Sequence, residues 1–317
     1  MPINQAVFDD IHPIMTLIGD CIRHMENKGI FQWNDHYPTL KIIASDIESG
    51  SMYVLKNGGD LLGMIAINEE QSPEYGQLNW RVRSGKVLVI HRLAIDPKWQ
   101  KQGIGRQLMD FAENYALENG YASIRLDAYS GNPRALQLYE RRGYQKAGQL
   151  VFPLRELPFF VYEKVMLKIR RYRESDFDQV WKLHILAMEQ IGVYKGDGPW
   201  DNDLRNIEKA YFDNNGEFLI GELDYKIIAM GAFKNSGKSL AEIKRMRVHP
   251  DFQGMGLGTI VFNELEKRAK SLGYQGFHLE TSELQIAARK LYEKCDFREV
   301  GRIVIDGFNC ILFEKSF

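Results

Sequence analysis

Apolar positions recur along the chain with two different periods, which separate the predicted helices from the predicted strands. Apolar residues three or four positions apart indicate one face of a helix, and such a series runs from Ile11 to Met25. Runs of apolar and β-branched residues bounded by Gly, Asn or Asp indicate strands instead. In the first half these rules predict helices at 11–25, 39–48 and 133–142, and strands at 5–8, 52–56, 61–68, 87–95, 123–127, 145–151 and 159–165.

The same order of elements starts again at residue 168. A strand at 168–171 precedes a helix at 175–190, for which Ser175 is the candidate N-cap. The elements that follow are a helix at 204–212 and strands at 218–222, 226–233, 300–305 and 310–314. The second half therefore repeats the arrangement of the first.

A glycine-rich segment follows the longest strand of the first half. Asp96-Pro97 ends that strand, and the next residues are Gln100-Lys101-Gln102-Gly103-Ile104-Gly105-Arg106. A helical pattern then continues until Gly120. Glycines at the start of a helix let backbone N–H groups converge on one point, where the helix dipole adds positive charge. This segment predicts an anion site, and a pyrophosphate is the anion that suits it.

The glycine-rich segment has a second copy, Gln253-Gly254-Met255-Gly256-Leu257-Gly258-Thr259. The offset is 153 residues, since 253 − 100 = 153, and it holds without a gap well beyond the loop. Residues that match at this offset include Gly120 with Gly273, Leu126 with Leu279, and Tyr139 with Tyr292. Two copies in register indicate a duplicated domain. We expect one domain over 1–166 and a second over 167–317.

Composition and charge narrow the class of protein. The chain has 317 residues, enough for two domains, and 41 basic against 42 acidic residues give a net charge of −1. This balance predicts neither a nucleic-acid nor a membrane partner. Cys21, Cys295 and Cys310 lack metal or redox spacing, and the histidines show no metal pattern. With no apolar run of membrane-spanning length and no signal-peptide pattern, we expect a cytoplasmic protein without a metal site.

The order of elements and the two glycine loops resemble the GNAT superfamily of N-acetyltransferases over essentially the whole chain, twice. The resemblance implies an α/β fold of two tandem domains, each with a mixed, mostly antiparallel sheet flanked by helices. It also implies acetyl-CoA as cofactor, with residues 100–106 and 253–259 around its pyrophosphate. The pantetheine arm would lie beside Leu93 and Ile95, or Met246 and Val248, and Asn132 matches the family's CoA-contacting asparagine.

The resemblance also suggests catalytic residues. Tyr139 and Tyr292 match the tyrosine that protonates the leaving thiolate; the alternative is that each packs a helix onto a sheet. Glu242 matches a catalytic glutamate found in some members; its counterpart in the first half is Val89, and His91 lies two residues further on the same strand face. Either side chain is a candidate base, or a polar neighbour without a catalytic role.

These residues predict an acetyl-CoA-dependent N-acetyltransferase in which a small-molecule or peptide amine attacks the thioester directly in a ternary complex. The alternative is an acyl-CoA-binding protein in which one or both halves are non-catalytic sensors or scaffolds. The counterpart of Asn132 is Gln285, which favours unequal halves. Trp33 and Trp200, in the loops after the first helix of each half, either line acceptor pockets or cap the cores. The sequence does not predict an oligomeric state.

Overall fold

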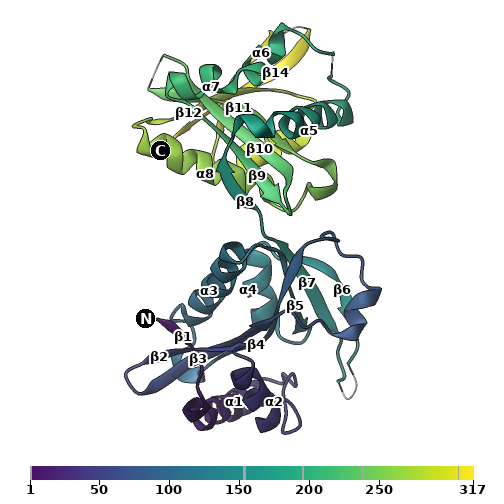
Figure 1. Ribbon diagram of the computed structural model, residues 1–317, viewed down its shortest axis with the longest axis vertical. Helices are drawn as coiled ribbons and strands as arrows, with labels where there is room; N and C mark the ends of the chain where they lie inside the picture. The colour runs from purple at the N-terminus through teal and green to yellow at the C-terminus, as the bar shows by residue number, and fades with distance from the viewer. Residues whose placement is uncertain (1, 153–154, 195, 238, 306) are drawn as a thin grey trace. The chain divides into compact units, whose positions relative to one another are not determined.

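The computed structural model describes residues 2–152, 155–194, 196–237, 239–305 and 307–317. The chain divides into two compact units, Met1–Met166 and Leu167–Phe317, each with one seven-stranded sheet between layers of helices (Figure 1). Within the described residues no helix is both long and apolar enough to cross a membrane. The same residues hold no group of three or more His, Cys, Asp or Glu side chains placed to bind a metal ion.

The sheet of the N-terminal unit has the order β1-β2-β3-β4-β5-β7-β6. Among the described strands of this sheet, β4 and β5 pair in parallel and all other neighbours pair antiparallel. The strands are β1 Ile3–Gln5, β2 Met52–Asn57, β3 Asp60–Asn68, β4 Lys86–Ile95, β5 Tyr121–Tyr129, β6 Gln145–Leu150 and β7 Phe159–Val165. This mixed, mostly antiparallel sheet confirms the predicted fold class.

The sheet of the C-terminal unit repeats this topology, with the order β13-β14-β12-β11-β10-β9-β8 and one parallel pair, β11 with β12. Its strands are β8 Lys168–Arg171, β9 Glu217–Leu223, β10 Lys226–Asn235, β11 Leu240–Val248, β12 Gly276–Ser282, β13 Arg298–Ile305 and β14 Phe308–Ser316. The parallel pair occupies the same place in both sheets, as expected for a duplicated domain.

Helices cover both faces of each sheet because each has one apolar stripe to bury. In the first unit, α1 (Ile11–Glu26) and α2 (Leu40–Glu48) pack on one face, and α3 (Ile104–Glu118) and α4 (Pro133–Arg141) on the other (Figure 1). The second unit has α5 (Phe177–Gln190), α6 (Asn202–Arg205), α7 (Ile207–Ala210), α8 (Leu257–Ser271) and α9 (Ile286–Lys294). Two hydrophobic cores therefore lie on opposite sides of the first sheet.

Three predicted boundaries were wrong for local reasons. The first strand ends at Gln5, because the carboxylate of Asp10 accepts the N–H of Val7 and turns the chain. A short 3-10 turn, Glu174–Asp176, precedes α5, so Ser175 is not its N-cap. The helix predicted at 204–212 is broken at Asn206, whose side chain caps α7 by accepting the N–H of Lys209.

The parallel strands separate partway along each sheet. Within the described residues, β4 pairs with β5 over Lys86–Ile90, and β11 pairs with β12 over Leu240–Glu242. Each central strand also carries a bulge, at His91 in β4 and at Arg245 and Met246 in β11, where the register with the preceding strand shifts. A gap therefore opens beyond residues 90 and 242 in the two sheets, flanked by the glycine-rich loops.

Candidate active site

Both glycine-rich loops adopt the same backbone conformation. Lys101 and Gly103 have φ values of 66° and 83°, and their counterparts Gly254 and Gly256 both have 77°. Left-handed residues in such a turn aim neighbouring N–H groups toward one side. The backbone hydrogen bonds of α3 begin at Gln107, whose N–H donates to the carbonyl of Gly103 at 3.0 Å. The preceding N–H groups of the first turn have no partner four residues back, so they are available to an anion.

A cavity of about 740 Å³ adjoins the loop of the N-terminal unit. Its wall contains ten of the residues predicted from sequence: Leu93, Ile95, Gln100, Lys101, Gly103, Ile104, Gly105, Arg106, Asn132 and Tyr139. Gln102 is not part of the wall, and its amide donates to the Lys98 carbonyl at 3.3 Å. A Cβ on Gly105 would lie 3.2 Å from Cδ1 of Ile95, so glycine lets the helix approach β4 closely.

Asn132, the N-cap of α4, and Tyr139, within α4, also line this cavity. The Asn132 side chain accepts the N–H of Ala135 at 3.2 Å and donates to Oε1 of Gln32 at 3.0 Å, so it caps α4 and holds the loop after α1. Tyr139 is buried, and its hydroxyl has no hydrogen-bond partner among the described residues. Burial, with a further contribution from Asp127, raises its pKa well above the usual value. The phenol is therefore protonated at neutral pH and able to donate.

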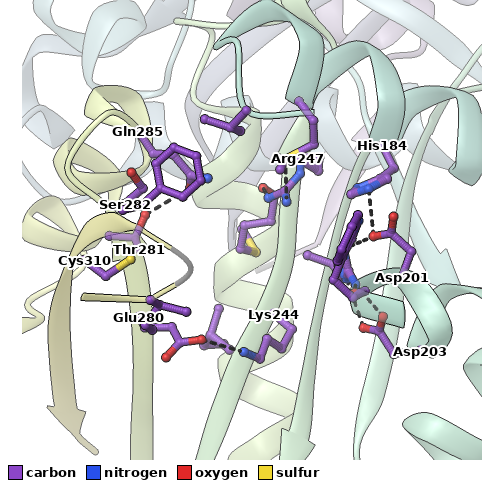
Figure 2. Close-up of a pocket in the computed structure, with 18 of the residues that line it drawn as sticks. His184, Asp201, Asp203, Lys244, Arg247, Glu280, Thr281, Ser282, Gln285 and Cys310 are labelled. Carbon is purple, nitrogen blue, oxygen red and sulfur yellow. Dashed lines mark hydrogen bonds and ion pairs between the residues drawn. The ribbon is translucent and has the colours of Figure 1, made fainter. Parts of the chain in front are cut away.

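The second unit has a cavity of about 520 Å³ in its own gap (Figure 2). Met246, Gln285 and Tyr292 line it, but its wall contains none of residues 253–259. Instead, the Gln253 side chain exchanges two hydrogen bonds with Gln190 of α5, at 3.2 and 2.8 Å. Tyr292 is buried, which raises its pKa to about 12 although the nearby Arg247 charge opposes the shift. The two units thus place equivalent tyrosines in differently built cavities.

The two candidate bases lie away from the described walls of both cavities. Glu242 pairs with Lys244 at 2.5 Å and with Lys234 at 3.1 Å; burial raises its pKa, but these lysines outweigh burial and leave the pKa below its usual value. The His91 ring contacts Oδ1 of Asn68 at 2.7 Å, and burial, aided by the charge of Arg92, lowers its pKa to about 4. Each side chain already has a polar partner in the structure.

Sequence reasoning did not single out two equivalent arginines on the central strands, of which Arg92 is buried and Arg245 is partly buried. Arg92 donates to both carboxylate oxygens of Asp46 on α2, at 2.7 and 2.6 Å. Its counterpart Arg245 binds Asp203 and, at 3.1 Å, Asp201. Arg92 thereby ties α2 to the central strand of its sheet, and Arg245 ties the start of α6 to the equivalent strand. The sequence could have indicated this pair, because Arg92 and Arg245 are identical residues that match at the 153-residue offset.

The loop tryptophans also reach the cavities. Trp33 is buried and lines the cavity of the first unit. Trp200 is half exposed and lines the cavity of the second unit, where its backbone carbonyl accepts from Arg245 at 2.5 Å. The residues between Tyr194 and Trp200 include Lys195, which lies outside the described residues.

The chain matches the acetyltransferase (GNAT) family over residues 16–144 and again over residues 179–297. An acetyltransferase of Pectobacterium atrosepticum is 28% identical over 141 residues, which are 44% of this chain and 93% of the relative. A mycothiol acetyltransferase of Geodermatophilus obscurus is 27% identical over 218 residues, which are 65% of this chain and 69% of the relative. A GNAT-family acetyltransferase structure from Listeria monocytogenes is 25% identical, covers 52% of this chain and 94% of its own, and has a TM-score of 0.43. The chain therefore belongs to the GNAT acetyltransferases, a family that uses acyl-CoA, and carries two tandem domains of that family.

Proposed function

We propose that the N-terminal unit binds acetyl-CoA and transfers the acetyl group to a primary amine in a ternary complex. The observation that carries this proposal is the composition of one cavity. It brings together the glycine loop, the exposed edge of β4, the α4 cap at Asn132 and the phenol of Tyr139. The same four features of the second unit do not share a described cavity, since its loop lies outside the wall.

The cofactor is held chiefly by backbone groups in this proposal. Unsatisfied N–H groups at the start of α3 bind the diphosphate, and the helix dipole contributes the equivalent of about half a positive charge there. Lys101 and Arg106 add two cations to the same wall. Leu93 and Ile95 line the approach to the gap between β4 and β5, where the pantetheine arm fits.

The chemistry asked of the protein is modest because acetyl-CoA supplies an already activated thioester. Tyr139 holds a proton at its hydroxyl and donates it to the departing sulfur. His91 is the proposed acceptor for the amine's proton; it acts through a water, because its ring is not part of the cavity wall. Glu242 has the corresponding proposed role in the second unit. The acceptor end of the N-terminal cavity contains Met25, Ile30 and Trp33, which favours an amine with an apolar body.

A second candidate function applies to the C-terminal unit alone, as a binding module without turnover. The reciprocal amide pair between Gln190 and Gln253 occupies the side chain at the start of its loop. Gln285, which replaces Asn132, accepts from the Thr281 hydroxyl at 3.0 Å and does not cap α9. Both differences favour a changed role for this half.

Matched substitutions in the two loops test which unit binds the cofactor. Arg106 and Thr259 are equivalent positions in the first turns of α3 and α8. Glutamate at either position suits the helix dipole, so folding is preserved, but its charge repels a diphosphate. We expect Arg106→Glu to raise the Kd for acetyl-CoA about tenfold or more, as a loss of more than about 1.4 kcal/mol requires. Thr259→Glu should leave the Kd within about twofold.

Isothermal calorimetry with the full-length protein gives these constants, and thiol release measured with a panel of amines gives turnover. A larger effect of Thr259→Glu than of Arg106→Glu would assign the cofactor to the other unit. Absence of saturable acetyl-CoA binding by the wild-type protein would refute the proposal.

A further inference from the structure

The cavity of the C-terminal unit contains an arginine that no described carboxylate neutralises. Four cationic side chains line this cavity, and three have acidic partners: Lys234 pairs with Glu242, Lys244 with Glu242 and Glu280, and Arg245 with Asp201 and Asp203. Among the described residues Arg247 has no such partner. It donates to the Met246 carbonyl at 2.8 Å and contacts the Met188 sulfur at 3.1 Å, and its buried Nε–H has no described acceptor.

This arrangement is costly for the protein on its own. A largely desolvated charge without a counter-charge loses hydration that one carbonyl and a thioether, which is a weak hydrogen-bond acceptor, replace only in part. Burial, followed by the nearby charge of Arg245, lowers the pKa of Arg247 to about 10, so the guanidinium still carries its charge at neutral pH. An anion entering the cavity would therefore gain a strong partner and relieve this cost.

The facing wall supplies further donors. Figure 2 shows Arg247 between the His184–Asp201 pair on one side and Ser282 and Gln285, at the end of β12, on the other. The Gln285 carbonyl oxygen already accepts from Thr281 at 3.0 Å, which leaves its amide N–H groups for a ligand. The Ser282 oxygen accepts the N–H of Leu284 at 3.3 Å, which leaves its hydroxyl hydrogen for a ligand. This side of the cavity thus offers mainly donors.

We propose that this cavity binds a small molecule bearing a single carboxylate, with Arg247 as the principal partner and Ser282 and Gln285 as additional donors. One negative charge matches the one cation of the described cavity wall that lacks a described acidic partner. A phosphate dianion suits the cavity less well, because the other cations are already paired and Asp201 adds its own negative charge to the same wall. The site does not depend on the acyl-transfer chemistry proposed above, because it requires no coenzyme A.

The N-terminal unit lacks this site and serves as an internal comparison. The position equivalent to Arg247 is Ala94, which is buried against the core beneath α1. The position equivalent to Gln285 is Asn132, whose side chain is engaged in capping α4 and in binding Gln32. Carboxylate binding is therefore expected at one site per chain.

Calorimetry on the full-length protein without coenzyme A tests the site at pH 7.5 and low salt. The probes are butyrate, L-phenylalanine, phenethylamine and inorganic phosphate. We expect saturable binding of the two carboxylates with a stoichiometry near one, and markedly weaker binding of phosphate and of the amine that lacks a carboxylate. Arg247→Gln should weaken carboxylate binding at least about tenfold. Lys234→Gln, a change at a cavity lysine already paired with Glu242, should leave it within about twofold.

Two results would overturn the proposal: no saturable carboxylate binding by the wild-type protein, or equal binding by wild type and Arg247→Gln. Preference for phosphate would overturn the assigned chemistry. If Arg247→Gln does not fold, Arg247→Lys replaces it, because lysine keeps the charge but loses the planar fork and should still weaken binding. Arg247→Met supplies a separate readout. An unligated melting temperature at or above that of wild type is expected for an unpaired charge, and a clear decrease would mark Arg247 as structural and refute the inference.

Discussion

Replacing Tyr139 by phenylalanine separates the two roles open to this residue, packing and proton donation. The substitution keeps the ring contacts with Tyr144 and Tyr162, whose centroids lie 5.9 and 6.1 Å away, and removes only the hydroxyl. That hydroxyl has no hydrogen-bond partner among the described residues and adjoins the cavity. We therefore expect the free energy of unfolding to change by less than about 1 kcal/mol.

The expected effect on turnover is much larger. Loss of a general acid lowers the rate by about 10²–10⁴-fold, which corresponds to about 3–5 kcal/mol of transition-state stabilisation. Steady-state thiol release should show this loss in kcat, whereas the acetyl-CoA Kd from calorimetry should remain near the wild-type value. Urea unfolding followed by circular dichroism provides the stability measurement on the same preparations.

Tyr292→Phe is the matched control, since Tyr292 is an equally buried tyrosine at the equivalent position. Catalysis in the first unit predicts that this variant retains turnover within about threefold. If Tyr139→Phe also retained wild-type kcat with binding intact, the phenol would not be the proton donor and its role would be packing alone.

Two further predictions concern the buried polar groups. Asp46→Asn, which removes the counter-charge of the buried Arg92, should destabilise the protein by about 3–5 kcal/mol in urea unfolding. Adding Arg92→Met to this variant should recover part of the loss. Additive effects of the two substitutions in the double-mutant cycle would contradict the coupling. Burial, followed by the charges of Arg247 and Arg245, lowers the pKa of His184 to about 3. As the pH falls, His184 is therefore protonated in the unfolded state before it is protonated in the folded state, and the free energy of unfolding decreases below about pH 6.5. This histidine should cost about 2 kcal/mol at pH 5 relative to pH 8, and His184→Leu should lose that part of the pH dependence; identical slopes for the two proteins would refute the assignment.

The sequence predicted the elements that depend on local patterns. Both glycine loops and the central strands follow from short-range rules, and the 153-residue offset carried them into the second half. The capping of α4 by Asn132 was not predicted, since the sequence indicated only a contact with CoA for this residue. The surroundings of Glu242 could not be predicted in this way. Its partner Lys234 is its cross-strand neighbour, an arrangement fixed by the register of β10 against β11. Arg92 and Asp46, 46 residues apart, meet only because α2 packs over the sheet.

The two units differ in how many residue pairs hold their parallel strands together, and we expect this difference to affect how easily the strands separate. β4 and β5 pair through five residue pairs, whereas the described residues of β11 and β12 pair through three. Fewer paired residues mean fewer backbone hydrogen bonds to break, so the free energy of separating the two strands locally is lower. Separating the strands to admit a bulkier ligand should therefore cost less free energy in the gap between β11 and β12 than in the gap between β4 and β5. We therefore expect the gap of the second unit to adapt to a bulkier ligand more readily than the gap of the first.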